Sequence, residues 1–295
     1  MKKNVIIYIL LSTLFSSYSF AQSGNPMKQL WNDPEFKKDF TASYGVIANY
    51  EPDLDDEDKK RLKSYYETIK QNPKSAITKM EKELKEDDNA AFYFILANLY
   101  FQEGNIDKAK LFYNKSIKKY PQFRRAHKNL GLVSVQAQDF QSAVLSLSKA
   151  MELGEIDERA YGLLGYSYLT LEKYFPAEVA YRQAILMQPN QKDWKLGLAQ
   201  CLLATEQYAD ASGILETLLF EDQDNVDYWI LQGNAYIGLE KSLKAARNFE
   251  IVKKLGGADF QTLNLLGDIY ISKNMPDLAL IAYSDSSKLA KKRRE

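Results

Sequence analysis

The sequence predicts an all-α protein built as an α-solenoid, a stack of helical hairpins. A 34-residue period runs through most of the chain. At this spacing one column of positions holds only small residues, and a second column, twelve residues later, holds only alanine. Small side chains at fixed places indicate helices that approach closely in every unit, as in a repeat array. The first column is Ala97, Gly131, Gly165, Ala199, Gly233 and Gly267, and the second is Ala109, Ala143, Ala177, Ala211, Ala245 and Ala279.

The unit 158–191 shows the pattern most fully. Its first half has apolar or small residues at positions i, i+3, i+4 and i+7, which share one face of a helix. A break at 172–175 follows, Pro176 suits the first turn of a second helix, and the same spacing then resumes. Each unit is therefore expected to be a helix–turn–helix. The residues are Tyr161, Leu164, Gly165 and Tyr168 in the first helix and Ala177, Tyr181, Ala184 and Ile185 in the second.

This order of small and large positions, with Pro121 and Pro189 near unit ends, resembles the tetratricopeptide repeat, a 34-residue helix–turn–helix unit. The resemblance implies a right-handed superhelix whose concave face is lined by the first helix of each unit. It also implies a scaffold that binds other proteins, without naming the partner. The six contiguous units are 90–123, 124–157, 158–191, 192–225, 226–259 and 260–293.

Residues 1–21 have the features of an export signal. Lys2 and Lys3 form a basic start, an apolar run follows, and Ser19 and Ala21 are small residues at the two positions that a signal peptidase inspects. The apolar run is shorter than the roughly 20 residues that span a bilayer, which disfavours an uncleaved anchor. We expect cleavage after Ala21, a periplasmic location and no stable membrane insertion of the mature chain.

Residues 22–58 lie outside the repeat and are rich in aromatic residues. Asp33 and Pro34 predict the start of a short helix, and the acidic run 51–58 is expected to be solvated. The stretch from Leu30 to Gly45 resembles the N-terminal region of exported repeat proteins of Gram-negative bacteria found with TonB-type energy-transduction systems. That resemblance implies TonB, ExbB or ExbD as partners. The alternative is that these aromatic residues form an arm that caps the first helices.

Residues 59–89 are expected to form a degenerate helical hairpin, with Asn72 as a cap and Pro73 at the first helical position. This hairpin explains why residues 91–101 are apolar nearly all round, because such a helix must be covered on both sides. At the other end of the chain, residues 277–290 carry a polar face suited to ending a solenoid.

The residue inventory argues against an enzyme. His127 is the only histidine and Cys201 the only cysteine, so neither an ordinary transition-metal site nor an intrachain disulfide can be assembled. Both are interpreted as core residues, because His127 occupies a column held elsewhere by large apolar or aromatic residues and Cys201 falls in an apolar helix. The chain has 39 Lys plus Arg and 39 Asp plus Glu, so it carries no net positive charge that would attract nucleic acid. We expect no catalytic residue, cofactor or metal.

The concave face supplies the candidate binding site. In the tetratricopeptide repeat family, the second, fifth, ninth and twelfth places of each unit line that face, and the fifth and ninth places here form an apolar strip suited to a peptide or helix. The strip comprises Phe94, Leu132, Tyr166, Leu196 and Ile230. Charge divides along the face and would set the direction of a bound segment: Arg125, Lys128 and Arg159 lie toward one side, and Asp193, Asp227 and Asp268 toward the other.

A carboxylate-binding cluster is the most specific hypothesis for this face. Some members of the family hold the C-terminal carboxylate of a peptide with lysine and asparagine donors, and three of those five places match here. The pattern has basic residues at the places of Phe94 and Leu163, so two positive charges are missing there. Arg125 and Lys128, one unit along, would restore the charge. The alternative is a set of solvated groove residues. The cluster comprises Asn98, Arg125, Lys128, Asn129 and Arg159.

The favoured interpretation is a non-enzymatic scaffold of the bacterial cell envelope that binds a peptide or helix of a partner. An auxiliary component of a TonB–ExbB–ExbD complex is the second. An envelope enzyme that uses the repeats to deliver substrate is the third, and the missing catalytic residues disfavour it.

Overall fold

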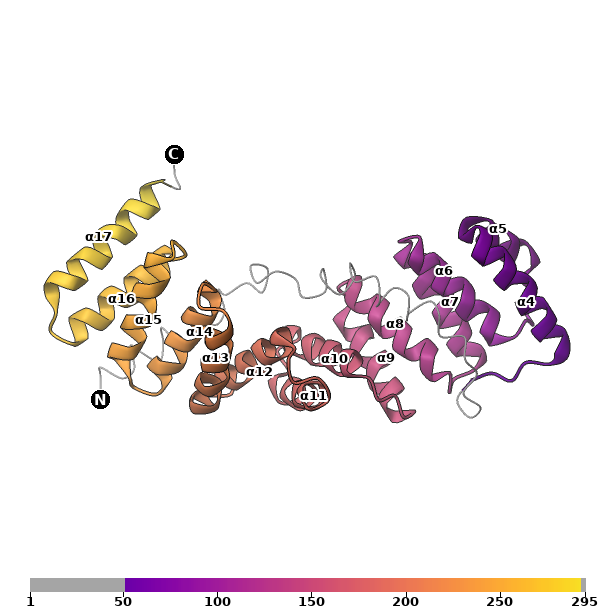
Figure 1. Cartoon of the computed structure of the whole chain (residues 1–295), viewed down its shortest axis with the longest axis horizontal. Coiled ribbons are helices and arrows are strands. Elements are labelled where there is room, and N and C mark those ends of the chain that lie inside the picture. Colours follow the sequence, from indigo (N-terminus) through magenta and orange to yellow (C-terminus); the bar gives the residue numbers. More distant parts are fainter. Residues whose placement is uncertain (1–50, 293–295) are drawn as a thin grey trace. The chain divides into compact units, whose positions relative to one another are not determined.

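The computed structural model describes residues 51–292, and every regular element in that range is an α-helix (Figure 1). The predicted all-α repeat solenoid is therefore confirmed. The expected export signal and the aromatic segment up to residue 50 lie outside the described residues. The chain divides between Lys173 and Tyr174 into two compact units, here called the N-terminal and C-terminal units. Each is treated separately below.

The N-terminal unit begins with the hairpin that precedes the repeats. Asp55 caps the first helix by accepting from the amide of Asp58, so Asp56 to Asp58 belong to a helical turn. Asn72 accepts from two amides of the second helix, and Pro73 is its first residue. The helices are α4 (Asp56–Gln71), α5 (Pro73–Glu83), α6 (Ala90–Gln102), α7 (Ile106–Lys119), α8 (Arg124–Gln136), α9 (Phe140–Glu152) and α10 (Glu158–Thr170).

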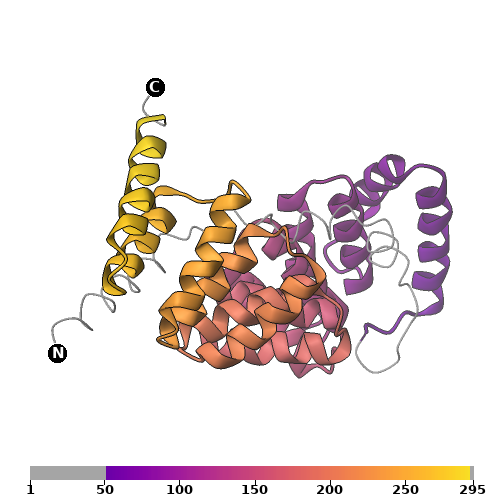
Figure 2. The ribbon, with the colours of Figure 1, turned by 60° about the vertical axis from the view of Figure 1, so that its left-hand side comes forward.

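The C-terminal unit continues the same alternation of helices. Its last two helices, α16 and α17, pack side by side as an antiparallel pair (Figures 1 and 2). The helices are α11 (Tyr174–Met187), α12 (Lys192–Ala204), α13 (Tyr208–Glu221), α14 (Val226–Gly238), α15 (Ser242–Lys254), α16 (Phe260–Ser272) and α17 (Pro276–Lys292).

The small-residue columns lie where helices approach. All six alanines of the second column have no exposed surface. A Cβ atom on Gly131 would lie 2.5 Å from Cγ of Leu147, and one on Gly233 would lie 2.6 Å from Cε1 of Phe249. Both distances are too short for carbon atoms, so in these two hairpins only glycine lets the first helix approach the second this closely.

A third column recurs at the same period, in the turn that ends each first helix. Its residue has a left-handed backbone in every unit, and its own amide and the next one close the helix end. In the first unit, the amide of Gly104 donates to Phe101 O and that of Asn105 to Tyr100 O, each at 2.9 Å. This is the Schellman arrangement. The column is Gly104, Gln138, Glu172, Glu206, Glu240 and Asn274.

The core explains the apolar helix α6 and corrects the expectation for α17. In α6, Ala90 and all residues from Phe92 to Phe101 are buried. In α17, Leu280 is 70% exposed and Ile281 is 52% exposed, whereas Ser286 is buried and donates to the carbonyl of Phe260. The polar face expected of 277–290 is thus present only in part, because Ser284, Ser287 and Lys288 are exposed but share the surface of the helix with these apolar residues. Its exposed side keeps the apolar residues that a following repeat would cover.

Candidate functional site

The structure places eight of the ten candidate residues in the N-terminal unit. They lie on the first helices of three successive hairpins: Phe94 and Asn98 on α6, Arg125, Lys128, Asn129 and Leu132 on α8, and Arg159 and Tyr166 on α10. The other two, Leu196 on α12 and Ile230 on α14, belong to the C-terminal unit.

Two candidate asparagines, Asn98 and Asn129, are joined in a buried hydrogen-bond network. Nδ2 of Asn129 donates to Oδ1 of Asn98 at 3.1 Å, and the hydroxyl of Tyr113 donates to the same oxygen. Both asparagines are buried, at 3% and 5% exposure. This network ties α6, α7 and α8 together, because buried polar groups that satisfy one another fix a packing arrangement. The oxygen of Asn98 is thus occupied within the fold.

Arg125 already holds a carboxylate, that of Glu51. The two side chains form an ion pair, with 14% of the arginine side chain and 5% of the glutamate side chain exposed. Cζ of Arg125 lies 5.3 Å from the centroid of the Phe94 ring, within the range of a cation–π contact. The acidic run 51–58 is therefore not uniformly solvated as expected. Its first residue is buried against the face that the sequence marked for carboxylate binding.

The remaining predicted cations also have acidic neighbours. Nζ of Lys128 lies 3.1 Å from Glu155 and 3.6 Å from Asp157, both in the loop before α10. Nε of Arg159 lies 3.9 Å from the carboxylate of Glu158. Glu155 additionally contacts Arg124 at 3.6 Å. A partner's carboxylate would therefore meet cations that are already paired, and would have to compete with these internal acids.

The apolar strip is mostly covered. Phe94, Leu132 and Ile230 are buried, with 3%, 4% and 6% exposure, whereas Tyr166 and Leu196 are half-buried. Tyr166 packs edge-on against Phe140 with ring centroids 5.6 Å apart, and burial raises the pKa of its hydroxyl. Of the strip, Tyr166 and Leu196 retain the surface that a ligand needs. Binding at these positions stays a prediction.

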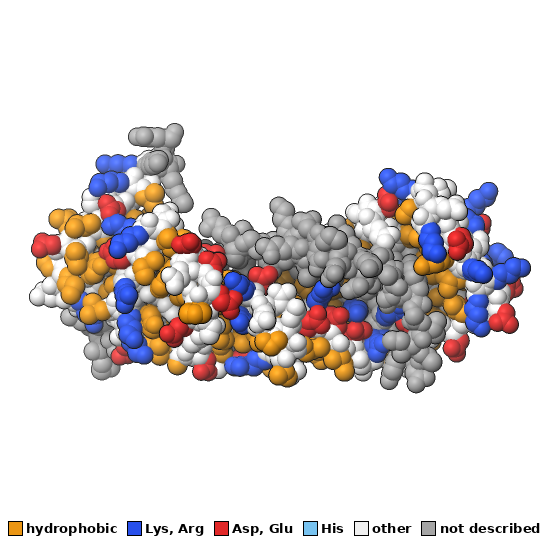
Figure 3. All heavy atoms as spheres, in the orientation of Figure 1, with side chains coloured by type: hydrophobic (Ala, Val, Ile, Leu, Met, Phe, Trp, Pro, Cys, Tyr) orange, Lys and Arg blue, Asp and Glu red, His pale blue; other side chains and the backbone are white. Residues whose placement is uncertain are grey.

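The acidic half of the predicted face lies in the C-terminal unit. Asp227 on α14 is half-buried, and burial raises the pKa of its carboxyl group. Asp268 on α16 is exposed and accepts from the hydroxyl of Tyr283 at 2.6 Å. Asp193 on α12 is exposed. Figure 3 shows acidic and basic side chains interspersed over the visible surface.

His127 and Cys201, the two residues weighed for catalysis or metal binding, have structural roles. Nε2 of His127 lies 2.9 Å from the carbonyl oxygen of Pro121, and burial lowers the pKa of its imidazole. Cys201 is fully buried, which raises the pKa of its thiol to about 12 and leaves it unreactive. Among residues 51–292, His, Cys, Asp and Glu form no group of three placed to hold a metal ion. In the same range no helix has the length and apolar character to cross a bilayer.

Comparison with known proteins identifies the family. Residues 112–263 match the family of the cytochrome c-type biogenesis protein H TPR domain, and residues 90–123 match the tetratricopeptide repeat itself. The chain belongs to the tetratricopeptide repeat (TPR) family. Proteins with these repeats are typically non-catalytic scaffolds for protein interactions.

Two curated relatives share sequence with the chain. The mouse (Mus musculus) peptidyl-prolyl cis-trans isomerase FKBP4 is 26% identical over 178 residues, which cover 55% of this chain and 37% of the relative. Its human (Homo sapiens) counterpart is 28% identical over 118 residues, which cover 35% of this chain and 26% of the relative. The chain thus spans well under half the length of either relative.

Solved structures of TPR proteins share the fold. YrrB, a TPR protein with an unusual peptide-binding site, superposes with a TM-score of 0.57 at 22% identity, covering 64% of this chain and 96% of YrrB. MamA from Desulfovibrio magneticus RS-1 superposes with a TM-score of 0.54 at 17% identity, covering 58% of this chain and 97% of MamA. Both likenesses concern the fold.

Sequence reasoning missed three residues of this surface. The run that holds Glu51 is expected to be solvated, Tyr113 belongs to a column of bulky residues at the 34-residue period, and Glu155 carries no expectation. A signal existed for Tyr113 alone, because its column holds an aromatic residue in four of six units. No local pattern pairs Glu51 with Arg125, which lies 74 residues further along the chain (125 minus 51).

Proposed function

We propose that the protein is a non-enzymatic scaffold of the bacterial cell envelope that binds a carboxylate-bearing peptide or helix of a partner. The proposed site is the Arg125 surface, formed by Phe94 on α6 and Arg125 on α8. The ion pair between Glu51 and Arg125 carries the proposal, because a carboxylate is already held there beside an aromatic ring. A partner's carboxylate would replace that of Glu51 and receive charge-assisted hydrogen bonds from the guanidinium.

The family and its solved members support a peptide as the ligand. YrrB is a TPR protein with a peptide-binding site, and the first helices of this chain's hairpins offer Tyr166 and Leu196 as partly exposed apolar contacts. Partly exposed apolar side chains on first helices suit the binding of an extended or helical segment. The absence of a convergent set of catalytic groups in the residue inventory favours scaffolding over an enzyme.

The location rests on residues 1–21, whose basic start, short apolar run and small residues before Gln22 support export with cleavage after Ala21. The intact mass of the protein purified from cells tests it: a mature chain that retains residues 1–21 would refute the cleavage. The stretch Leu30 to Gly45 favours a second candidate, an auxiliary role beside TonB, ExbB or ExbD.

Site-specific crosslinking in cells, from photoreactive residues at Tyr166 or Leu196, identifies the partner. Capture of TonB, ExbB or ExbD would support the second candidate, and capture of another envelope protein would support a general scaffold. The captured segment is then synthesised with a free and with an amidated C-terminus for affinity measurements.

The binding measurement uses charge variants at the Arg125 surface. Arg125→Glu is expected to weaken binding at least tenfold, which is about 1.4 kcal/mol, and Glu51→Gln to strengthen it by removing the internal competitor. Lys128→Glu combined with Arg159→Glu tests the wider cluster. Arg247→Glu, an exposed residue on α15, is the matched control and should have no effect. Equal affinities for Arg125→Glu and the control would refute carboxylate binding at this surface.

A further inference from the structure

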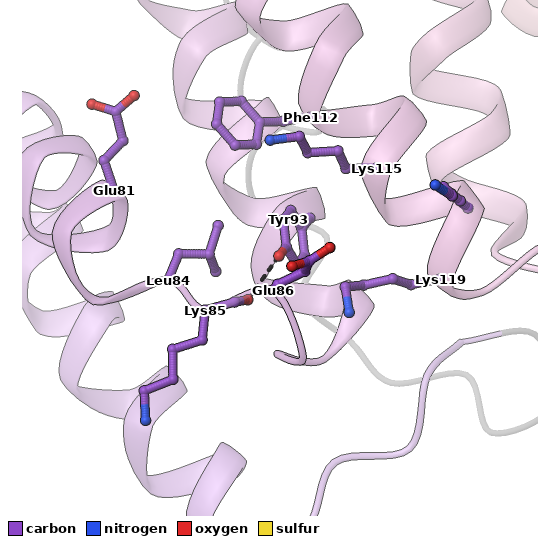
Figure 4. Close-up of a pocket in the computed structure, with 9 residues that line it drawn as sticks. Glu81, Leu84, Lys85, Glu86, Tyr93, Phe112, Lys115 and Lys119 are labelled. Atoms are coloured by element: carbon purple, nitrogen blue, oxygen red, sulfur yellow. Dashed lines mark hydrogen bonds between the residues drawn. The ribbon is translucent and has the colours of Figure 1, made fainter.

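A cavity of about 630 Å³ opens between α5, α6 and α7 in the N-terminal unit (Figure 4). Its volume lies within the ~300–1,000 Å³ that ligand sites usually occupy. Tyr93 and Phe112 form its aromatic floor, and four lysines surround that floor. We call these the rim lysines: Lys85, Lys115, Lys118 and Lys119. The cavity shares no residue with the Arg125 surface.

The floor is rigid and apolar. Tyr93 and Phe112 are 5% and 8% exposed, with ring centroids 6.5 Å apart, and Tyr100 stacks on Phe112 at 5.5 Å. The hydroxyl of Tyr93 donates to the carbonyl of Lys85 at 2.7 Å, which fixes the loop after α5 against α6. Rings held in this way are fixed before a ligand arrives, so a ligand binds without first ordering them.

The rim lysines are not neutralised by the described part of the chain. No carboxylate of residues 51–292 lies within ion-pair distance of any of them, whereas other lysines of the same unit do have such partners: Lys74 with Glu103, Lys108 with Glu81, Lys110 with Asp139 and Lys128 with Glu155. Nζ of Lys115 lies 5.0 Å from the centroid of Phe112, and Nζ of Lys119 lies 5.4 Å from that of Tyr93. In Figure 4 both amines reach the floor from α7.

Two carboxylates also line the cavity, Glu81 and Glu86. Glu81 is engaged, because it accepts from the hydroxyl of Tyr100 and from Nζ of Lys108 at 3.0 Å. Among the lining residues that leaves Glu86 against four lysines. Asp87 and Asp88 lie close by, because burial and the charges of Asp88, Glu86 and Asp87 raise the pKa of Tyr93, but Asp88 is paired with Arg61. Lys118 and Lys119 lie in the last turn of α7, where the helix dipole favours positive charge, so their presence has a structural explanation. It does not account for Lys85, in the loop after α5, or for Lys115, one turn earlier on α7.

We propose that this cavity binds an acidic peptide segment that contains an aromatic or large apolar residue. The apolar side chain lies on the floor formed by Tyr93 and Phe112, and the flanking carboxylates face the rim lysines. An anionic membrane surface fits less well, because a flat bilayer meets the lysines but does not reach a recessed aromatic floor. Inorganic phosphate alone leaves the floor unused. The site would give the scaffold a second, charge-selected contact, separate from the Arg125 surface.

The test uses a fluorescein-labelled peptide of sequence Glu-Glu-Phe-Glu-Glu with an amidated C-terminus, so that it offers no terminal carboxylate to the Arg125 surface. Fluorescence anisotropy measures its binding to the full chain. Lys115→Glu combined with Lys119→Glu is expected to weaken binding at least tenfold. Glu86→Gln is expected to strengthen it severalfold, because an opposing charge in the lining of the cavity disappears. Substituting Gln for every Glu of the peptide should abolish binding.

The matched control is Lys60→Glu combined with Lys63→Glu, an equal charge change on the exposed face of α4. It should leave the affinity within a factor of two of the unmodified chain, which excludes a simple effect of net charge. Equal weakening by the control and rim variants would overturn the proposal, as would binding that Glu86→Gln leaves unchanged. Vesicles of phosphatidylglycerol and phosphatidylcholine form a second arm. Binding to vesicles through Lys115 and Lys119 without binding of the peptide would also overturn it, in favour of a lipid surface.

Discussion

The first and last repeats contain the same tyrosine contact in two different surroundings. In the first, the hydroxyl of Tyr113 donates to Oδ1 of Asn98; in the last, that of Tyr283 donates to Oδ1 of Asp268 at 2.6 Å. The two pairs are five periods apart. The first pair is buried and Asn129 of the next hairpin closes it, whereas Asp268 is exposed. The hairpin itself makes this bond, and the following repeat decides whether it is buried.

A second hydrogen bond, from a serine hydroxyl to a backbone carbonyl, is buried in both the first and the last repeat. Oγ of Ser116 donates to the carbonyl of Ala90 at 2.9 Å, and Oγ of Ser286, five periods later, donates to that of Phe260 at 3.2 Å. Both serines are buried, because each faces the first helix of its own hairpin. Contacts inside a hairpin are thus the same at the two ends of the array. Contacts between hairpins are not.

The exposed apolar residues of the last repeat follow the same rule. Leu203 is 1% exposed and Ile271, two periods later in the same column, is 55% exposed. Val144 and Ala246 are 7% and 3% exposed, and Leu280 of their column is 70% exposed. These columns face the next repeat. The comparison predicts that one substitution has different effects in the interior and at the end.

The largest difference is expected at the column of Leu203 and Ile271. Leu203→Ala removes a fully packed side chain and should destabilise its region by about 2 to 5 kcal/mol. Ile271→Ala removes a half-exposed one and should cost below about 1 kcal/mol. Hydrogen exchange measured segment by segment gives both values. Similar losses for the two variants would show that Ile271 is covered in solution.

A smaller difference is expected at the tyrosine contact. Tyr113→Phe removes one of the two donors to the buried oxygen of Asn98 and should cost about 0.5 to 1.5 kcal/mol. Tyr283→Phe frees a carboxylate that water reaches, so its effect should be within about 0.5 kcal/mol. Urea unfolding followed by hydrogen exchange of the two hairpins separates them. A large effect of Tyr283→Phe would contradict the role assigned to the neighbouring repeat.

The loss of stability at low pH should also differ between the two ends of the repeat array. Arg61 donates to both oxygens of Asp88 at 2.6 and 2.7 Å, and this bonding holds the pKa of that carboxyl below 3.8. The resulting stability is present above that value and lost as pH falls through the lowered folded-state pKa. Asp88→Asn should therefore cost on the order of 1 kcal/mol at neutral pH and nothing in strong acid.

Asp285 is the matched residue at the other end. Its hydrogen bond with Lys253 also lowers its pKa, but 29% of each side chain is exposed. Water screens such a pair, so Asp285→Asn should have the smaller effect at neutral pH. Stability measured for both variants and the unmodified chain from neutral pH to below pH 3.8 provides the comparison. A cost of Asp88→Asn that persists in strong acid would mean that the ion pair is not its origin.

The smallest effects are expected in the left-handed column. Glu240 has a φ of 59° at the end of α14, so Glu240→Gly should stabilise by about 0.5 to 1 kcal/mol after the added freedom of the unfolded chain is counted. Gly104→Ala, at the same place in the first unit, should destabilise by a similar amount. Thermal unfolding measures both. A destabilising Glu240→Gly would indicate a different turn in solution.

The sequence alone determined the fold class, because a helical hairpin is specified by local spacing and its packing is repeated every 34 residues. The alanine column is buried throughout, and Asn72 and Pro73 start α5 as expected. The left-handed turn was missed because its usual residue, glycine, occupies it only at Gly104, while glutamine, glutamate and asparagine occupy it elsewhere.

Only the tertiary structure decided which candidate residues are available to a ligand. A spacing rule places Arg125 and Asn98 on the concave face, but it does not show that Glu51 pairs with the first or that Tyr113 and Asn129 engage the second. These partners come from other helices or from the segment before α4, at separations that no helical period encodes. The rim lysines were likewise separate residues in the sequence. They became one site because α5 packs beside α6 and α7 and brings Lys85 near Lys115 around a shared aromatic floor.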